Sequence, residues 1–186
     1  GLVVFFWGVG AYNRLVRLKN AIANAFGQID VQLKRRYDLI PNLVEVAKKY
    51  LAHEAQTLEA VIAARNTARN AEQTVAGAPF NAAAMGALAG AETLLGGALG
   101  KLMAVVENYP ELKADQNMRE LSEELASTEN RLGFARQAYN DHVLEFNDAA
   151  QQFPTLLIAR LFGFQPQTEL AATTTDEERA PVAVRF

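Results

Sequence analysis

Cysteine is absent from the 186 residues of this chain, and histidine occurs only twice, at His53 and His142. The lack of thiols excludes a disulfide framework, a zinc knuckle and a cysteine nucleophile. Neither histidine follows a glutamate by three residues, the spacing found in di-iron helical bundles. The HExxH pattern of zinc proteases is also missing. The sequence therefore predicts no metal site.

Motifs for phosphate binding and for nucleophilic catalysis are missing as well. The chain contains no GxxxxGK[ST] loop, no GxGxxG turn and no GxSxG elbow. An all-helical chain would also deprive these motifs of the strands that give them their geometry. Acidic residues are plentiful, but their neighbours single out no pair as a hydrolase site. We expect no catalytic residue and no cofactor, and therefore a protein that is not an enzyme.

Positively charged residues are slightly fewer than negatively charged ones, and charge is unevenly distributed along the chain. The formal net charge is -3, which argues against nucleic acid as a partner. Residues 1–12 carry no charge, residues 13–50 carry a net +5, and the remainder carries a net -8. The chain is thus apolar, then basic, then acidic.

The uncharged start of the chain is typical of a membrane anchor. Twelve helical residues rise roughly 18 Å, whereas a hydrocarbon core is about 30 Å thick. We therefore interpret residues 1–12 as the C-terminal part of a single transmembrane helix. A cleaved signal peptide and a buried N-terminal helix are the alternatives. The basic residues that follow favour a cytoplasmic bundle. The predicted anchor residues are Leu2, Val3, Val4, Phe5, Phe6 and Trp7.

Apolar residues recur every three or four positions from residue 13 to residue 163, which predicts one all-α domain. We expect the first long helix to end before Pro41, because proline suits the first turn of the next helix. The second helix would reach about residue 75, the third would end before Pro110, and the fourth would cover about 118–149. Four long helices with short loops predict an antiparallel four-helix bundle.

Charged residues interrupt the apolar stripes of these helices. Buried charges are unfavourable unless they are paired, so we expect an interhelical polar network that fixes the register of the bundle. A ligand or metal site is the alternative interpretation. The predicted network residues are Arg36, Glu54, Arg65, Glu92, Glu129 and His142.

The third helix carries small-residue spacings, Gly86xxxGly90 and Gly96xxxGly100, that occur in packed membrane helices. A second membrane span is one interpretation of this pattern. Glu92 and Lys101 lie within the same stretch, and the apolar stripe is unbroken. These features favour a tightly packed bundle helix.

The last segment, residues 164–186, loses the helical period and is predicted to be an extended tail. Its final residues place Val182, Val184 and Phe186 on one face of a possible strand. An isolated strand is unstable. We therefore expect these three residues to contact another copy of the chain, with disorder in a monomer or folding back onto the bundle as alternatives.

Two long stretches resemble the LemA family of bacterial membrane-anchored proteins. They are YNRLVRLKNAIANAFGQIDVQLKRRYDLIPNLVEVAKKYLAHEAQTLEAVIAAR and LMAVVENYPELKADQNMRELSEELASTENRLGFARQAYNDHVLEFN. The resemblance implies one N-terminal span in a bacterial inner membrane followed by a four-helix bundle, and it brings no established catalytic activity. Tyr37 occupies a position where histidine is common in the family. Relatives with lipoprotein-like starts imply an extracytoplasmic bundle, so the side of the membrane stays open.

Two functions are consistent with these observations. The first is a membrane-anchored, non-enzymatic scaffold that self-associates in the membrane plane and organises or shapes the membrane. Its partners would be the lipid bilayer and further copies of the chain, and a variant of this function is an adaptor for another membrane protein. The second is a metal- or small-ligand-binding bundle, a sensor or a hydrolase, that uses the buried Glu, Arg and His residues.

Overall fold

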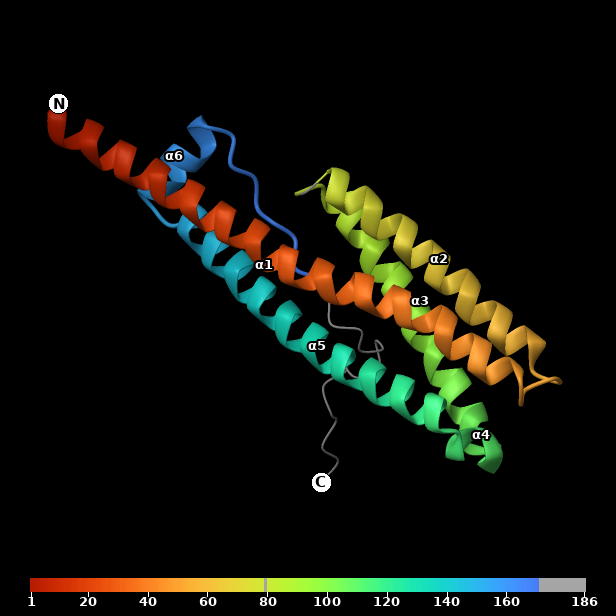
Figure 1. Ribbon diagram of the computed structural model, residues 1–186. Helices are drawn as coiled ribbons and strands as arrows, with labels where there is room; N and C mark the ends of the chain where they lie inside the picture. The colour runs from red at the N-terminus through yellow and green to blue at the C-terminus, as the bar shows by residue number, and fades with distance from the viewer. Residues whose placement is uncertain (79, 171–186) are drawn as a thin grey trace, which may run out of the picture.

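The computed structural model describes residues 1–78 and 80–170, and these residues form six helices and no strand. The predicted all-α class is therefore confirmed for the described part of the chain. Four helices are long and lie lengthwise beside one another, and two are short (Figure 1). Their bounds are α1 Leu2–Lys48, α2 Ala55–Gly77, α3 Ala82–Glu107, α4 Pro110–Ala114, α5 Gln116–Gln151 and α6 Thr155–Leu161.

Helix α1 is one continuous helix of 47 residues, about 70 Å long at 1.5 Å per residue. It continues through Pro41, so the prediction that a new helix begins there is wrong. An interior proline destabilises a helix by about 3 kcal/mol. The apolar stripe nevertheless continues on the same face through Leu43, Val44 and Ala47, which are buried, and their burial offsets this loss. The chain turns only after Lys48.

Helices α2 and α3 form an antiparallel hairpin (Figure 1). Asn81 starts α3 because its side-chain oxygen accepts a hydrogen bond from the Ala84 amide at 3.0 Å. Within the described residues, α3 is the one helix long and apolar enough to cross a membrane. Its stripe of Met85, Leu88 and Leu95 is buried against the other helices. One face of α3 is thus buried in the bundle, while residues such as Leu94 on its other side are exposed.

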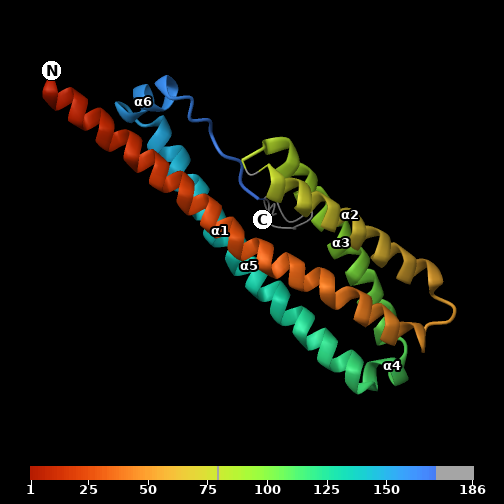
Figure 2. The same ribbon diagram turned by 45° about the horizontal axis from the view of Figure 1, so that its top comes forward.

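Helix α5 runs antiparallel to α1, and both helices extend beyond the turn that joins α2 to α3 (Figure 2). Helix α6 and the segment that follows it cover this extended part. The Phe162 ring lies 4.9 Å from that of Tyr12, and the Phe164 ring lies 6.2 Å from that of Phe146. These aromatic contacts join the start of α1 to the end of α5.

Two asparagines of α5 hold the extended segment after α6. Asn147 accepts from the Gln167 amide at 2.7 Å and donates to the Gln167 carbonyl at 2.9 Å. Asn140 bonds the amide and the carbonyl of Leu170 in the same way, each at 2.8 Å. Residues 164–170 of the predicted tail therefore fold back onto the bundle. The predicted oligomer contacts Val182, Val184 and Phe186 lie outside the described residues.

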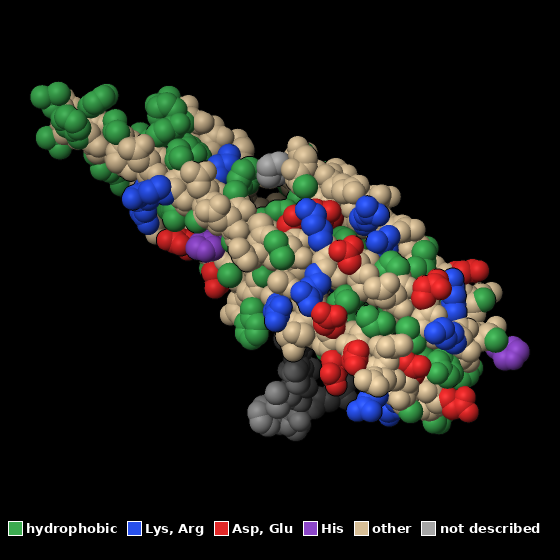
Figure 3. All heavy atoms as spheres, in the orientation of Figure 1, with side chains coloured by type: hydrophobic (Ala, Val, Ile, Leu, Met, Phe, Trp, Pro, Cys, Tyr) green, Lys and Arg blue, Asp and Glu red, His purple; other side chains and the backbone are tan. Residues whose placement is uncertain are grey.

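The first residues of α1 project from the end of the bundle with their apolar side chains exposed. Figure 3 shows hydrophobic side chains gathered at the end of the molecule formed by the start of α1 and by α6. The exposed side chains include all six predicted anchor residues, Leu2, Val3, Val4, Phe5, Phe6 and Trp7. Because α1 is unbroken, this apolar stretch and the core of the bundle belong to one helix.

Candidate functional site

Arg36 of α1 is the centre of a buried ionic cluster in the middle of the bundle. Its side chain is 3% exposed, and its Nη1 lies 2.6 Å from Oε2 of Glu92 on α3, which is 4% exposed. Its Nε lies 2.8 Å from Oε1 of Glu129 on α5, an ion pair that lacks the alignment of a hydrogen bond. Arg36 therefore links three helices at one level.

The second oxygen of Glu92 is also occupied. The Tyr37 hydroxyl, from the position next to Arg36, donates a hydrogen bond to Oε1 of Glu92. Burial, followed by the nearby Glu92 carboxylate, raises the pKa of Tyr37 well above its ordinary value. The phenol therefore stays protonated and acts as a permanent donor to Glu92.

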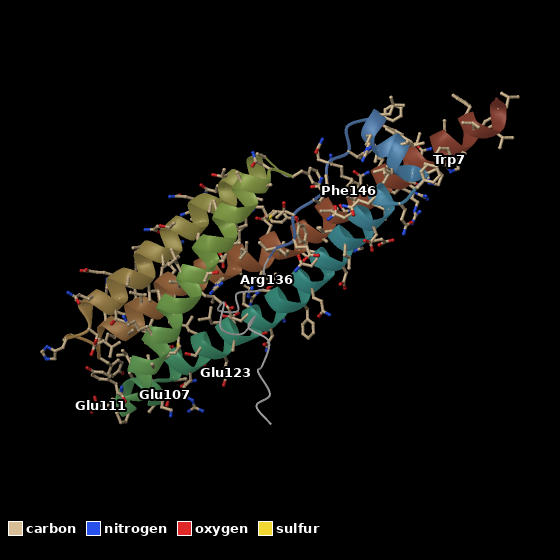
Figure 4. The ribbon with its side chains drawn as sticks, turned by 180° about the vertical axis from the view of Figure 1, so that it is seen from behind. Trp7, Glu107, Glu111, Glu123, Arg136 and Phe146 are labelled. Carbon is tan, nitrogen blue, oxygen red and sulfur yellow. The ribbon has the colours of Figure 1, made fainter. Side chains whose placement is uncertain are left out.

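Arg136 of α5 completes the balance of charge around the cluster. It is 8% exposed, and Figure 4 shows it on the side of α5 that faces the other helices. Burial lowers the pKa of its guanidinium, whereas the carboxylates of Glu92 and Glu129 act in the opposite direction. Two arginines and two glutamates thus gather at one level of the bundle, where their formal charges cancel. Glu129 is the most exposed of the four, at 39%.

Arg65 of α2 does not reach this cluster but compensates for Pro41. A proline at position 41 has no N–H, so the Tyr37 carbonyl, four residues earlier, loses its helical donor. The Nε of Arg65 donates to this carbonyl at 3.0 Å. An arginine from a neighbouring helix therefore replaces the missing backbone hydrogen bond.

Besides Arg65, the structure places two more of the predicted network residues outside the cluster. Glu54 is half-buried just before α2, where its carboxylate is 3.5 Å from the Tyr109 hydroxyl. The His142 side chain is 42% exposed and lies 4.0 Å from Glu145 on the same helix. Val143 is buried in its place, because the stripe of α5 steps from Tyr139 by four residues. The prediction that His142 is buried in the network is wrong for this reason. Glu54, like Arg65, makes a polar contact with another segment, apart from the cluster around Arg36.

Arg136 is the functional side chain that the sequence interpretation missed. Ala135, one residue earlier, also fits the apolar stripe of α5. From Leu132, a step of three reaches Ala135 and a step of four reaches Arg136, and both precede Tyr139 by an allowed step. The available signal for a buried charge was therefore an arginine at position 136, which fits the apolar stripe as well as Ala135 does.

A separate pair of carboxyl groups joins α1 to α2. Glu72 is 2% exposed and lies beside Asp30, which forms an ion pair with Lys34 at 2.8 Å. Burial and the Asp30 carboxylate raise the pKa of Glu72 to about 7. Burial opposes ionisation of Asp30 too, but hydrogen bonds with Glu72 and Lys34 leave its pKa below the ordinary value. Of these two carboxyl groups, Glu72 is thus the one that holds a proton more readily.

A cavity of about 370 Å³ between α3 and α5 reaches the edge of the cluster. Arg36 and Glu129 contribute its polar wall, and both are already paired with each other. No group of three or more His, Asp or Glu side chains in the described ranges is arranged to hold a metal ion. The remaining wall is Gly96, Leu99, Gly100, Met103, Ser122, Leu125 and Ala126.

The fold and the cluster define a class of protein: an all-helical rod in which the arginines and glutamates around Arg36 neutralise one another. The chain belongs to the LemA family, whose profile matches residues 25–186. It is similar to the magnetosome protein MamQ of Magnetospirillum gryphiswaldense, at 26% identity over 174 residues. Magnetosome protein MamQ 2 of Paramagnetospirillum magneticum gives the same identity. Each alignment covers 83% of this chain but 62% of the relative.

Proposed function

We propose that this protein is a membrane-anchored, non-enzymatic scaffold whose copies associate in the plane of a bacterial inner membrane. The observation that carries the proposal is the uncharged start of α1, which projects from the bundle with its apolar side chains exposed. Exposing Leu2, Val3 and Phe5 to water is unfavourable, and a hydrocarbon layer removes this penalty. The similarity to magnetosome proteins is consistent with a role at a membrane.

The ionic cluster supports a structural role in preference to turnover of a substrate. A general base needs a lone pair that is free to accept a proton from a substrate. Both oxygens of Glu92 are instead occupied, by Arg36 and Tyr37. Pairing of this kind fixes the register of the helices. We therefore assign the cluster to cohesion of the rod.

The proposed tethering supports self-association. Copies that share one membrane plane have a high local concentration, so weak lateral contacts become effective. The long helices expose separate large apolar side chains, among them Val31, Leu94 and Phe134. Such side chains provide small contact points along the rod.

Flotation with lipid vesicles tests the anchor. The double variant Phe5→Lys with Phe6→Lys places two charges in the projecting start of α1 and should leave the vesicle fraction. The matched control is Phe134→Lys, which charges a similarly exposed aromatic on α5 and should float like the unaltered chain. Equal flotation of all three proteins would contradict an anchor at residues 1–12.

Light scattering in detergent tests self-association separately. We expect a mass of several chains at high protein concentration and dissociation on dilution. A monomer at every concentration, in detergent and in nanodiscs, would refute the scaffold while leaving the anchor intact.

The cavity between α3 and α5 favours a second candidate, a bundle that binds a small ligand. Its glycine-rich wall gives access to Arg36 and Glu129, and a ligand with its own charged group would compete for these partners. Elemental analysis and mass spectrometry of the purified protein test this candidate. A stoichiometric metal or small molecule that survives dialysis would favour it over the scaffold.

A further inference from the structure

Helix α6 lies against the part of α1 where the anchor meets the bundle. Ile158 of α6 packs against Gly8 of α1. The Cδ1 atom of Ile158 lies 3.6 Å from the position that a Cβ at Gly8 would occupy. One helical turn further along α1, the Tyr12 ring contacts that of Phe162. Helix α6 is therefore beside residues 8–12 of α1, at the end of the predicted membrane anchor.

The two faces of α6 have different surroundings. Ala159 is buried and Ile158 is half-buried against the bundle. The opposite face exposes Leu157 and Leu161, and large apolar side chains flank the helix on both sides. We call this surface the apolar shoulder: Phe153, Leu157, Leu161 and Phe162, which are 79%, 54%, 75% and 58% exposed.

The apolar shoulder continues the exposed apolar surface of the anchor, and basic residues accompany both. Helix α6 carries one charged residue, Arg160, which is exposed. On α1 the first charged residues are Arg14 and Arg17, both exposed, and the first acid comes only at Asp30. Apolar side chains beside exposed arginines match the boundary between acyl chains and anionic headgroups.

We propose that the apolar shoulder lies in the interfacial layer of an anionic bilayer and forms a second membrane contact beside the anchor. This inference rests on the proposed anchoring by α1. A single helix leaves the rod free to tilt about the point where it enters the membrane. Contact through α6 adds a second point of support, because the aromatic contacts of Tyr12, Phe162 and Phe164 join α6 to α1.

Depth-dependent quenching of tryptophan by brominated lipids tests this contact in the full chain. Trp7 is the only tryptophan, so its emission in the unaltered protein reports on the anchor. The variant Trp7→Phe with Leu161→Trp moves the reporter to the apolar shoulder, and Trp7→Phe with Phe134→Trp is the control on an equally exposed site of α5. The vesicles contain phosphatidylcholine and phosphatidylglycerol, with bromine either near the headgroup or deep in the acyl chain.

We expect the indole from Leu161→Trp to lose emission with shallow bromine and the Phe134→Trp control to keep it. Quenching of Trp7 without quenching at position 161 would overturn the shoulder contact and leave the anchor intact. Quenching at position 161 without quenching of Trp7 would refute the anchor, and with it the proposal of a second contact beside the anchor. A blue-shifted emission at position 161 that bromine leaves unchanged would show a protein-covered surface and overturn the proposal. Circular dichroism checks that each variant is folded.

Discussion

Arg35 and Arg36 are adjacent in the chain but have opposite surroundings. Arg36 is buried between Glu92 and Glu129, whereas Arg35 pairs with Glu124 with both side chains about half exposed. Removing one member of a buried pair leaves a buried charge without compensation. We expect Arg36→Met to reduce the free energy of unfolding by about 3–5 kcal/mol, measured by urea denaturation.

Arg35→Met is the matched control, since it removes the same charge from the adjacent position. An exposed pair contributes about 1 kcal/mol or less, so this variant should unfold close to the unaltered protein. Similar losses in the two variants would contradict a buried cluster centred on Arg36.

The hydrogen bond from Arg65 to the Tyr37 carbonyl has a test of its own. In Pro41→Ala, a backbone N–H returns to position 41 and bonds this carbonyl itself. We expect Arg65→Met to destabilise the protein by about 1–2 kcal/mol in the presence of Pro41. In the Pro41→Ala background the loss should be clearly smaller, and a double-mutant cycle measures the difference. Equal losses in both backgrounds would mean that Arg65 acts through other contacts.

Glu72 should make stability depend on pH near neutrality. Its pKa is about 7 in the folded chain, above the ordinary value of 4.5, so the folded state holds this proton more tightly. The resulting stabilisation is complete below the ordinary value and is lost as pH rises through 7. We expect the free energy of unfolding to fall by on the order of 2 kcal/mol across this range.

Glu72→Gln, which is neutral at every pH, should flatten this dependence and be the more stable protein in mild alkali. Glu123→Gln, which changes an exposed glutamate of α5 (Figure 4), is the control and should follow the unaltered profile. Urea denaturation over a pH series measures all three proteins.

At the residue scale, the sequence showed which charged residues are buried more clearly than it showed which residues they pair with. Arg36 and Glu92 interrupt apolar stripes, and a stripe position is visible in one dimension. Arg136 was missed because steps of three and four are equivalent along a helix. The role of Arg65 was also hidden, since it depends on which carbonyl of α1 lies opposite α2.

At the element scale, Asn140 and Asn147 are seven residues apart on α5 and bond residues three apart in the extended segment. Two helical turns rise about 10.5 Å, and three extended residues span about the same distance, so the spacings match. We expect Asn140→Ala to increase hydrogen exchange at the Leu170 amide, which donates to Asn140. Asn147→Ala should do the same at Gln167.

The control for these variants is Asn130→Ala, an exposed asparagine on the same helix. Exchange at residues 164–170 should be unchanged in this variant. Unchanged exchange in all three variants would show that the aromatic contacts alone hold the segment.

The helix boundaries show where sequence periodicity is limited. The first helix was expected to stop before Pro41 because local rules favour a break there. The actual turn follows Lys48, since buried Leu43, Val44 and Ala47 and the donor from Arg65 outweigh the local preference. The hydrogen bonds that Asn140 and Asn147 form with the extended segment leave no periodic pattern in the sequence. Each bond joins a side chain of α5 to backbone groups that are distant in the sequence.

At the scale of the whole molecule, the continuity of α1 gives the rod a predicted height. From residue 12 to residue 48 the helix rises about 54 Å, so the turn that contains His53 should be far from the bilayer. The absence of cysteine permits one label per variant. Energy transfer from a dye on His53→Cys to labelled lipid should be weak, and from Arg17→Cys it should be strong. Equal transfer from the two sites would contradict an upright rod.

The order of the helices along the chain has a consequence for synthesis. Helix α1 leaves the ribosome first, but its most extensive partner, α5, begins only at Gln116, and α6 follows at Thr155. During translation, the apolar stripe of α1 therefore lacks most of its cover until α5 has been synthesised. Nascent chains with such late partners are prone to aggregation. Early capture of the leading residues by a lipid layer would keep the growing polypeptides apart until the last helices arrive.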